Sequence, residues 1–343
     1  MTRIKEAPKT ILVTGGTGFI GSHVCVELLA EGYEIVVADN LTNSNLEVIE
    51  QIKRITGKAV IFYKIDIRDR EALGKIFKAH KIYSVIHCAG LKSVEESVKN
   101  PLLYYDNNVY GSVVLLQIMV EFNVKKIVFS SSACVYGADA SVPYIETSLI
   151  RPVNPYGKSK LFVEEILRDV ALSDPEWRVA LLRYFNPIGA HPSGLIGEDP
   201  KLSPNNLVPY MCQVAYGLKP ELLVFGNDYD TLDGTAIRDY IHVVDLALGH
   251  IKAMRWLESN DGVLVANLGT GKGASVMELI EAFSRVTDRT VPHRFVSRRD
   301  GDISSYYADA TYAEKQLGWH ASRSIDEACE DAWRWQQSRF PAH

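Results

Sequence analysis

Short apolar runs alternate with longer stretches of helical periodicity along the first half of the chain. Most of these runs are continuous and do not alternate in polarity, which is typical of strands buried on both faces of a sheet. The helical segments between them leave room for parallel pairing, so the pattern predicts an α/β fold with a doubly wound parallel sheet. The predicted strands are Thr10–Thr14, Glu34–Ala38, Val60–Ile65, Ser84–His87, Lys126–Ser130 and Val179–Arg183.

The alternation ends after the sixth of these strands, where prolines and glycines become frequent. We therefore predict a first domain over residues 1–185 and a smaller C-terminal α/β domain over residues 186–343. Arg238–Ala247 is again apolar, and we expect it to return to the sheet of the first domain, within a segment near 235–265. Asp326–Gln336 has the spacing of an amphipathic helix.

Composition narrows the functional classes. A net charge of -5 argues against a nucleic-acid-binding surface. The five cysteines are odd in number and form no CxxC pair, which favours free thiols in a reducing, cytoplasmic environment. The opening M-T-R-I-K-E-A-P-K lacks the apolar stretch of a secretory signal, and no apolar run is long enough to cross a membrane.

Tyr156 and Lys160 stand four residues apart in P-Y-G-K-S-K, so a helix would place both on one face. A nearby ammonium favours the phenolate form of tyrosine. Because free tyrosine has a pKa of ~10, ionisation at neutral pH requires a drop of ~3 units, or about 4 kcal/mol. A phenolate beside a hydride acceptor can act as general base toward an alcohol. An ordinary solvated helix would show the same spacing, so the interpretation depends on a cofactor site.

A glycine-rich turn supplies that site. Gly15, Gly18 and Gly21 lie in T-G-G-T-G-F-I-G, directly after the first predicted strand and at the start of a helix over Phe19–Ala30. Such glycines let a pyrophosphate approach the backbone at the helix N-terminus, although a turn without a ligand would also accommodate them. Asp39 ends the second strand, where a carboxylate would bind the adenosine ribose and repel a 2′-phosphate. The first domain is therefore predicted to be a Rossmann-type domain that binds NAD.

Three further sequence features are predicted to border the NAD-binding site. Asp66 and Ile67 follow the third strand and could flank the adenine, although Asp66 could equally cap a turn. His87-Cys88-Ala89-Gly90 follows the fourth strand, and Cys88 could instead be a small buried hydrophobe. Ser132 lies in the serine-rich segment at 130–133 and would hydrogen-bond the reacting oxygen, although a turn serine is the plainer interpretation.

From about residue 10 to 337 the chain closely resembles the extended short-chain dehydrogenase/reductase family, and within it the branch that epimerises UDP-hexoses. The glycine loop and the Tyr–Lys spacing are shared across the superfamily, whereas two longer segments are more specific to this branch. The resemblance is carried by T-G-G-T-G-F-I-G-S-H, A-D-N-L, A-G-L-K-S-V, F-S-S-S-A-C-V-Y-G, P-Y-G-K-S-K, L-R-Y-F-N-P-I-G-A-H-P-S-G, N-N-L-V-P-Y, V-F-G-N-D-Y-D-T-L-D-G-T, R-D-Y-I-H-V-V-D-L-A and R-R-D-G-D.

The resemblance implies reversible epimerisation of UDP-glucose and UDP-galactose at carbon 4. Tightly bound NAD would accept a hydride while Tyr156 removes the hydroxyl proton, and a transient 4-keto sugar would rotate before the hydride returns to its other face. Lys160 would hold the nicotinamide ribose and lower the pKa of Tyr156. The cofactor-binding residues implied in addition to those above are Phe19, Ile20, Asn40, Lys92, Asn107, Ser130 and Tyr184, with Tyr156 and Lys160 themselves.

The resemblance also assigns residues 186–343 to binding the nucleotide sugar. Arg238 would bind the diphosphate, although a salt bridge with the adjacent Asp239 is an alternative. Tyr306 would crowd the C2 substituent of the sugar and disfavour N-acetylhexosamines, or it could serve packing alone. The implied substrate-binding residues are Lys92, Ser132, Cys134, Tyr156, Phe185, Asn186, Asn206, Leu207, Phe225, Arg238, Arg299, Asp302 and Tyr306. A homodimer formed through a helix bundle is also implied.

The chain departs from the family pattern at three positions. Cys134 stands where threonine is usual, and a thiol is a weaker hydrogen-bond donor than a hydroxyl. Cys88 replaces a more usual phenylalanine, and Tyr110 replaces a more usual asparagine. With Cys134, either a second hydrogen bond to the substrate is dispensable or the rate is reduced. The changes at Cys88 and Tyr110 concern the packing of the cofactor and leave the implied reaction intact.

Three alternatives share the fold. A nucleotide-sugar 4,6-dehydratase needs an Asp-Glu pair after the fifth strand, where this chain has Ala133-Cys134. A related enzyme could act on a different carbon or on a uronic acid, which the sequence does not decide. A regulator that only senses the cofactor commonly lacks the Tyr–Lys pair that is present here.

Overall fold

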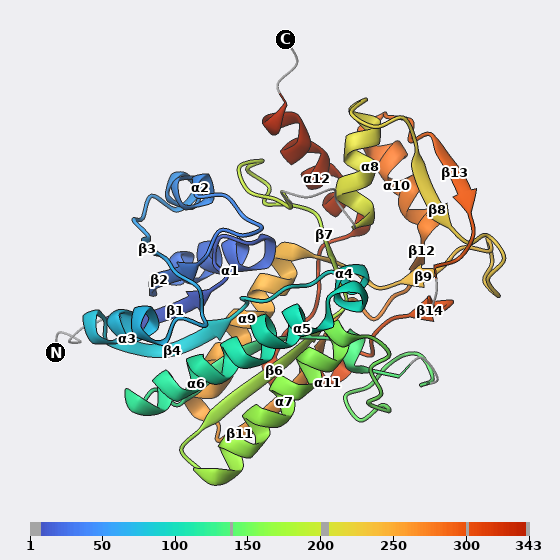
Figure 1. Cartoon of the computed structure of the whole chain (residues 1–343). Helices are drawn as coiled ribbons and strands as arrows, with labels where there is room; N and C mark the ends of the chain where they lie inside the picture. Colours follow the sequence, from blue (N-terminus) through green and yellow to red (C-terminus); the bar gives the residue numbers. More distant parts are fainter. Residues whose placement is uncertain (1–7, 138–139, 200–205, 300–301, 341–343) are drawn as a thin grey trace.

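The computed structural model describes residues 8–137, 140–199, 206–299 and 302–340. The segment in which no secretory signal is expected, residues 1–7, lies outside the described residues. A seven-stranded sheet in the order β11-β6-β5-β4-β1-β2-β3 forms the centre of the molecule (Figure 1). All of its neighbouring strands pair in parallel. The strands are β1 (Thr10–Thr14), β2 (Glu34–Asp39), β3 (Ile61–Lys64), β4 (Ile82–His87), β5 (Lys126–Ser132), β6 (Arg178–Tyr184) and β11 (Gly262–Leu268).

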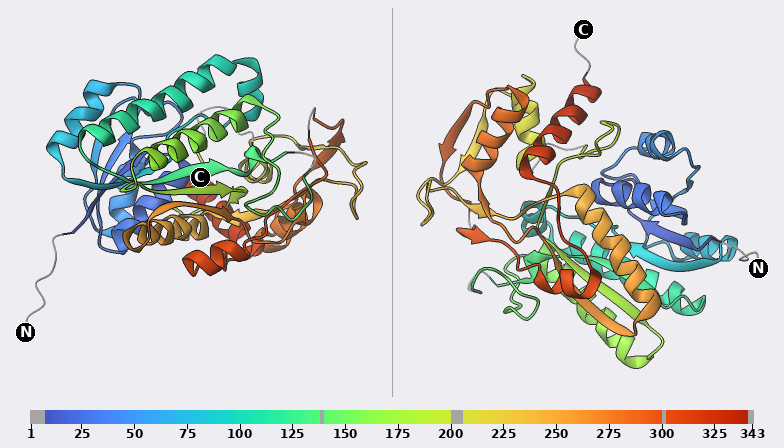
Figure 2. Two further views of the ribbon diagram at one scale, coloured as in Figure 1. Left: turned by 90° about the horizontal axis from the view of Figure 1, so that it is seen from below. Right: turned by 180° about the vertical axis from the view of Figure 1, so that it is seen from behind.

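Helices cover both faces of this sheet, and the left view of Figure 2 shows the sheet between the two layers. Strand residues point alternately to the two faces, so one strand contributes to two separate cores, as Val37 and Val36 of β2 do. On one face lie α1 (Phe19–Ala30), α2 (Glu47–Thr56), α9 (Val243–Ser259) and α11 (Thr311–Leu317). On the other lie α3 (Arg70–Ala79), α6 (Gly111–Glu121) and α7 (Pro155–Ser173), together with α4 (Val94–Lys99), α5 (Pro101–Tyr104) and the π-helical segment η1 (Tyr105–Tyr110).

The six strands predicted from the sequence are confirmed, with ends shifted by at most two residues. The prediction for Arg238–Ala247 is wrong. This segment forms the short strands β9 (Ile237–Arg238) and β10 (Tyr240–His242), which pair outside the central sheet, and then enters α9. From Val243 onward the apolar residues recur at helical spacing, and Leu246, Ala247 and Ile251 are buried against the sheet. The seventh strand is β11, which pairs with β6.

The remaining elements form a separate core in the C-terminal part of the chain. β7 (Asn186–Ile188) pairs with β10, β8 (Leu222–Phe225) pairs with β13 (His293–Val296), and β9 pairs with β12 (Ala274–Ser275) and β14 (Ser305–Tyr306). Three helices pack on them: α8 (Leu207–Ala215), α10 (Val276–Thr287) and α12 (Ile325–Arg339). The predicted C-terminal helix is thus confirmed as α12, and Trp333 is buried in this core beside Phe283.

All seven parallel strands end at the same edge of the central sheet, so the segments after β1, β2, β3, β4 and β5 meet there. Ligands of open parallel sheets bind at this carboxyl edge. Figures 1 and 2 show the elements of the C-terminal core gathered at one side of the sheet. Within the described part of the chain, no helix has both the length and the apolar character required to span a membrane.

Candidate functional site

Helix α7 carries the Tyr–Lys pair and starts in a fixed position. The side chain of Asn154 caps the helix by accepting the Gly157 N–H at 2.8 Å, and Pro155 occupies the first turn, where its missing N–H is harmless. A Cβ on Gly157 would lie 2.3 Å from the carbonyl oxygen of Cys134, so only glycine permits this close approach. The helix start is thereby pressed against the segment that follows β5, beside Ser132.

Lys160 is buried on the second turn of α7, with its side chain directed toward the end of β5. Its Nζ donates to the Ser130 carbonyl at 2.8 Å and lies 5.0 Å from the centre of the Phe129 ring. A Cβ on Gly90 would come within 3.5 Å of Nζ, so the ammonium also borders the segment after β4. Burial lowers the pKa of Lys160 to about 8. Lys160 therefore lies between two of the predicted cofactor-binding segments.

Tyr156 is less acidic in the protein than the sequence led us to expect. Burial raises the pKa of Tyr156 well above its ordinary value, and hydrogen bonding with Ser132 lowers it only in part. The Lys160 Nζ lies 6.0 Å from the centre of the Tyr156 ring. Because loss of solvation outweighs the nearby positive charge, the chain's own residues do not hold Tyr156 as a phenolate.

The glycine loop fits a dinucleotide pyrophosphate. Gly15 has a left-handed backbone with φ of +70°, and a Cβ there would lie 2.7 Å from the Ala89 nitrogen. A Cβ on Gly21 would lie 2.2 Å from the Gly15 carbonyl oxygen, so α1 packs closely on the turn. Gly18 begins α1 without any side-chain cap. The loop is thus a backbone surface at a helix N-terminus, which binds phosphate well.

The two carboxylates predicted to border the adenosine, Asp39 and Asp66, lie at or just after the ends of neighbouring strands of the sheet. Asp39, at the end of β2, accepts the N–H groups of Leu41 and Thr17 at 2.9 and 3.2 Å. Asp66 accepts the Arg68 N–H at 3.0 Å, so the alternative that it caps a turn is confirmed. It also accepts from the Asn40 side chain at 3.0 Å, and hydrogen bonds from Arg68 hold the pKa of Asp66 far below its usual range.

A buried chain of hydrogen bonds lies next to Lys160. The His250 Nδ1 faces the Leu246 carbonyl oxygen at 2.9 Å, which can only accept, so Nδ1 carries the proton and Nε2 accepts from the Tyr184 hydroxyl. Tyr184 also contacts the Ser130 hydroxyl, whose oxygen lies 3.1 Å from the Cys88 sulfur. Burial lowers the pKa of His250 to about 4, which keeps the ring neutral. This series of hydrogen bonds fixes the position of Ser130, whose carbonyl oxygen accepts a hydrogen bond from Lys160.

Sequence reasoning selected Asn107 and missed its neighbour. Asn108 is buried and ties two functional segments together: its Oδ1 accepts the Leu91 N–H at 2.8 Å, and its Nδ2 donates to the Ser159 hydroxyl at 3.0 Å. Asn107 donates to the Asn108 Oδ1 at 2.9 Å. The two asparagines are adjacent in the sequence, and only the three-dimensional contacts distinguish them.

A buried ion pair that the sequence did not reveal fixes the position of α7. The Arg183 Nε and Nη2 donate to the two oxygens of Glu164 at 3.0 and 2.6 Å, and both side chains are almost fully buried. Ser131 donates to the same carboxylate. Glu164 follows Lys160 by one helical turn, so the pair joins α7 to β5 and β6. Removing one partner of a buried ion pair typically costs 3–5 kcal/mol.

Some of the predicted nucleotide-sugar residues lie on or next to β9 and β14: Arg238, Tyr306, Asp302 and Asn186. The Oδ1 of Asn186 is buried and has no hydrogen-bond partner within the described chain, as expected of a group that binds a ligand. Arg238 pairs with Asp302 at 2.6 Å, so two predicted site residues bind each other. The alternative pairing with Asp239 is wrong, because that carboxylate instead accepts the Thr270 N–H at 2.8 Å.

Two further clusters border this region. The Arg299 guanidinium stacks on the Phe225 ring at 3.9 Å, a surface suited to a flat base. Asn206, which precedes Leu207 at the start of α8, donates to the Glu198 carboxylate at 2.6 Å. Lys92 donates to the same oxygen at 2.6 Å. Glu198 was not among the residues predicted from the sequence.

Aromatic rings enclose the position next to Ser132. The Tyr306 ring lies 5.0 Å from that of Phe185 and 5.4 Å from that of Tyr144. Cys134 interacts with Ser132 and Tyr306, and burial raises the pKa of its thiol. Cys134 is therefore a neutral thiol, and it can supply only a weak hydrogen bond beside these aromatic rings.

Several predicted cofactor residues are positioned by the same segments. Ile67 is buried after β3, Ala89 contacts the glycine loop, and Phe19 and Ile20 form the first turn of α1. Among the described residues, no cluster of His, Cys, Asp and Glu side chains has the arrangement of a metal site. The predicted residues thus gather at the carboxyl edge of the sheet and at the adjoining C-terminal core.

Comparison with known proteins gives a consistent result. The NAD dependent epimerase/dehydratase family model matches residues 11–269. The UDP-glucose 4-epimerase of Bacillus subtilis is 56% identical over 328 residues, covering 96% of this chain and 97% of the relative.

Two solved structures superpose closely. A UDP-glucose 4-epimerase from Bifidobacterium longum in complex with NAD+ and UDP is 50% identical with a TM-score of 0.94, covering 97% of this chain and 99% of the other. The corresponding structure from Stenotrophomonas maltophila, with bound NAD and formylated UDP-arabinopyranose, is 50% identical with a TM-score of 0.94, covering 96% of this chain and 98% of the other.

Proposed function

Since this chain belongs to the NAD-dependent epimerase/dehydratase family, we propose that it is a UDP-glucose 4-epimerase, which interconverts UDP-glucose and UDP-galactose with tightly bound NAD. The observation that carries this proposal is the convergence of Tyr156, Lys160 and Ser132 beside a glycine cradle, in a chain 56% identical to a named UDP-glucose 4-epimerase. We further propose that residues 1–185, with a return segment near 235–265, bind the cofactor and that residues 186–343 bind the nucleotide sugar.

The roles of the three central residues follow from their surroundings. Tyr156 removes the proton from the 4-hydroxyl of the sugar and returns it, passing through a 4-keto sugar. Ser132 orients the reacting oxygen, because its hydroxyl already interacts with the Tyr156 phenol. NAD, when bound, supplies the hydride acceptor and a positive charge. Lys160 adds the second positive charge next to Tyr156, and together they offset the effect of burial on the Tyr156 pKa.

The chain would hold NAD through its backbone loop and through Asp39. Gly15, Gly18 and Gly21 leave room for the pyrophosphate, and the start of α1 offers free N–H groups to it. The Asp39 carboxylate would accept from the adenosine ribose and repel a 2′-phosphate, which favours NAD over NADP. The Lys160 ammonium would donate to the nicotinamide ribose.

The diphosphate would bind between Asn186, Asn206 and Arg238. Arginine suits this role because its planar fork matches phosphate oxygens and remains charged. The stacked pair of Arg299 and Phe225 would hold the uracil. Firm binding of the nucleotide leaves the sugar free to rotate, so that hydride can return to its other face without loss of the keto sugar.

Product analysis tests this proposal. Purified protein, supplied with UDP-galactose and no added NAD, should form UDP-glucose and should contain NAD that has stayed bound through purification. A 4-keto-6-deoxy product would indicate a dehydratase instead, and binding of NAD without turnover of any UDP-hexose would indicate a regulator. The sequence favours the epimerase, because Ser132-Ala133-Cys134 stands where a dehydratase needs an acid–base pair.

Tyr306 should restrict the substrate at carbon 2 of the sugar. Its ring is packed between Phe185 and Tyr144, so an N-acetyl group would have to displace it. Overpacking costs about 1–3 kcal/mol, and each 1.4 kcal/mol is about tenfold in rate or affinity. We expect kcat/KM for UDP-N-acetylglucosamine to be about 30-fold below that for UDP-glucose, and Tyr306→Ser to narrow this difference. The exposed Tyr312 provides a control, Tyr312→Ser. Equal kcat/KM values in the unaltered protein would contradict this role.

We also propose a homodimer in the cytoplasm. Apolar side chains are exposed on α4 to α7, where a second copy could cover them; they include Val98, Leu102, Tyr110 and Phe162. The five free cysteines favour a reducing compartment. No role for nucleic acid or a membrane is proposed. Sedimentation should give twice the chain mass of 38.3 kDa.

A further inference from the structure

The loop between β7 and α8 reaches across to the cofactor side of the molecule. Residues 189–199, here called the 189–199 loop, touch segments that follow three different strands. Asp199 accepts from the Asn45 side chain, after β2, at 2.9 Å. Glu198 accepts from Lys92, after β4, at 2.6 Å. The His191 ring lies 6.3 Å from that of His23, in the helix after β1.

These three segments border the dinucleotide groove. The segment after β1 contains the glycine loop, the segment after β2 begins with Asp39, and the segment after β4 contains Ala89 and Gly90. Because β2 and β4 flank β1 in the sheet, the 189–199 loop contacts segments on both sides of the glycine loop, where NAD would bind.

The other side of the loop is fastened to α12. Arg334 donates to the Pro192 carbonyl at 3.0 Å, and Ser338 donates to the Gly194 carbonyl at 2.6 Å. A Cβ on Gly197 would come within 2.5 Å of the Trp335 ring, so the backbone lies flat on that indole. Figure 1 shows this yellow-green segment between α2 and α12.

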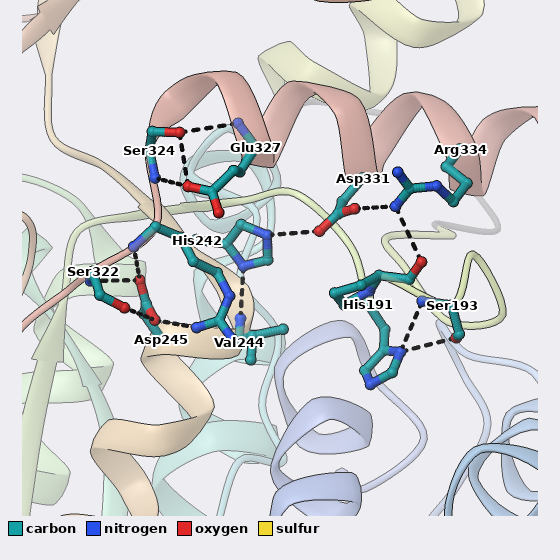
Figure 3. Close-up of polar contacts among 12 residues, drawn as sticks. His191, Ser193, His242, Val244, Asp245, Ser322, Ser324, Glu327, Asp331 and Arg334 are labelled. Atoms are coloured by element: carbon teal, nitrogen blue, oxygen red, sulfur yellow. Dashed lines mark hydrogen bonds and ion pairs between the residues drawn. The ribbon is translucent and has the colours of Figure 1, made fainter.

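Helix α12 is joined at this point to His242, the last residue of β10. Asp331 pairs with Arg334 and also with His242, whose Nε2 lies 3.3 Å from the carboxylate (Figure 3). The Asp245 carboxylate, at the start of α9, accepts the Ser322 N–H at 2.9 Å. The loop thus makes several contacts with α12, through Arg334, Ser338 and Trp335. The contacts with Asn45 and Lys92 are single polar contacts between side chains that are not fully buried.

We propose that the 189–199 loop retains NAD, and that the contact between Asp199 and Asn45 must open before the dinucleotide can leave. Asp199 also pairs with Arg339 of α12 at 2.9 Å, so it joins the cofactor side directly to that helix. Asp199 and Asn45 act as positioning residues that touch neither the sugar nor the reacting atoms. The inference rests on the proposed function only in requiring NAD as the cofactor.

Cofactor exchange tests this inference on the intact holoenzyme. Bound NAD is exchanged for isotopically labelled NAD in excess, and native mass spectrometry follows the labelled fraction with time. Hydrogen bonds to charged groups are among the stronger ones in proteins. We therefore expect Asn45→Ala and Asp199→Ala each to speed exchange by about tenfold. Since they remove the same contact, the double variant should exchange no faster than the quicker single variant.

A matched control separates retention from general loosening. Arg285→Ala removes an exposed ion pair of 2.6 Å with Asp326, which also lies on α12 but away from the loop. Its exchange rate should match that of the unaltered protein. Unchanged exchange in both single variants would overturn the inference, as would single effects that multiply in the double variant. Equal acceleration in the Arg285 control would do the same. If the purified protein cannot be loaded with NAD, the proposed function fails instead.

Discussion

Replacing Tyr156 with phenylalanine is expected to lower kcat for UDP-galactose by about 10³-fold, since general base catalysis is typically worth 10²–10⁴-fold. The substitution removes one oxygen and keeps the ring, so the packing of α7 against the segment after β5 is retained. NAD should remain bound, because the glycine loop, Asp39 and Lys160 are unchanged. The measurement is kcat together with the NAD content of the purified variant.

Tyr312→Phe is the matched control for this result. Tyr312 lies on α11 and is 42% exposed, so removing its hydroxyl should leave kcat unchanged. A Tyr156 variant that turns over at the rate of the unaltered protein would show that another group takes the proton. Loss of NAD together with activity would place Tyr156 in cofactor binding instead.

Replacing Lys160 with methionine is expected to lower kcat by about 10²-fold, near the lower end of what a proton-transfer group contributes. Methionine keeps the length and apolar packing of the buried stem and removes the charge. Without that charge the Tyr156 pKa rises, so the acid limb of the pH–rate profile should move to higher pH. Lys158→Met removes an exposed lysine from the same helix and should change neither rate nor profile.

The alkaline limb gives a second readout for Lys160. Burial lowers the pKa of this ammonium to about 8, so its charge is present below that pH and is lost as pH rises through it. The protein should therefore lose activity on the alkaline side, and the methionine variant, assayed with NAD in excess, should lack this limb. An identical alkaline limb in both proteins would mean that Lys160 does not titrate in the reaction.

Local patterns in the sequence were sufficient for much of the fold and for the centre of the site. The strand–glycine–helix pattern at Thr10–Ala30 predicts β1 and α1 at the observed bounds, because turn chemistry and helical periodicity act over short distances. The spacing of Tyr156 and Lys160 likewise predicts that both lie on one helix, as α7 confirms. Arg238–Ala247 was misassigned because a short apolar run fits a strand and a buried helix equally well.

Contacts between distant segments were beyond local reasoning. Arg238 pairs with Asp302 and Glu164 with Arg183, and no spacing rule connects the members of either pair. Asn108 and His250 act on the site through Leu91 and Tyr184, so their importance appears only when the chain is folded. The effect of burial on the Tyr156 pKa could not be predicted for a related reason, because it depends on how the folded chain surrounds the phenol.

The ionisation of Tyr156 is the point on which the proposed chemistry depends. Ultraviolet difference titration of the NAD-loaded protein against its Tyr156→Phe variant isolates the phenolate signal of this one residue. The account predicts that the signal titrates near neutral pH when NAD is bound, and only under strongly alkaline conditions when NAD has been removed. A Tyr156 signal that stays absent at neutral pH with NAD bound would contradict the assignment of this residue as the base.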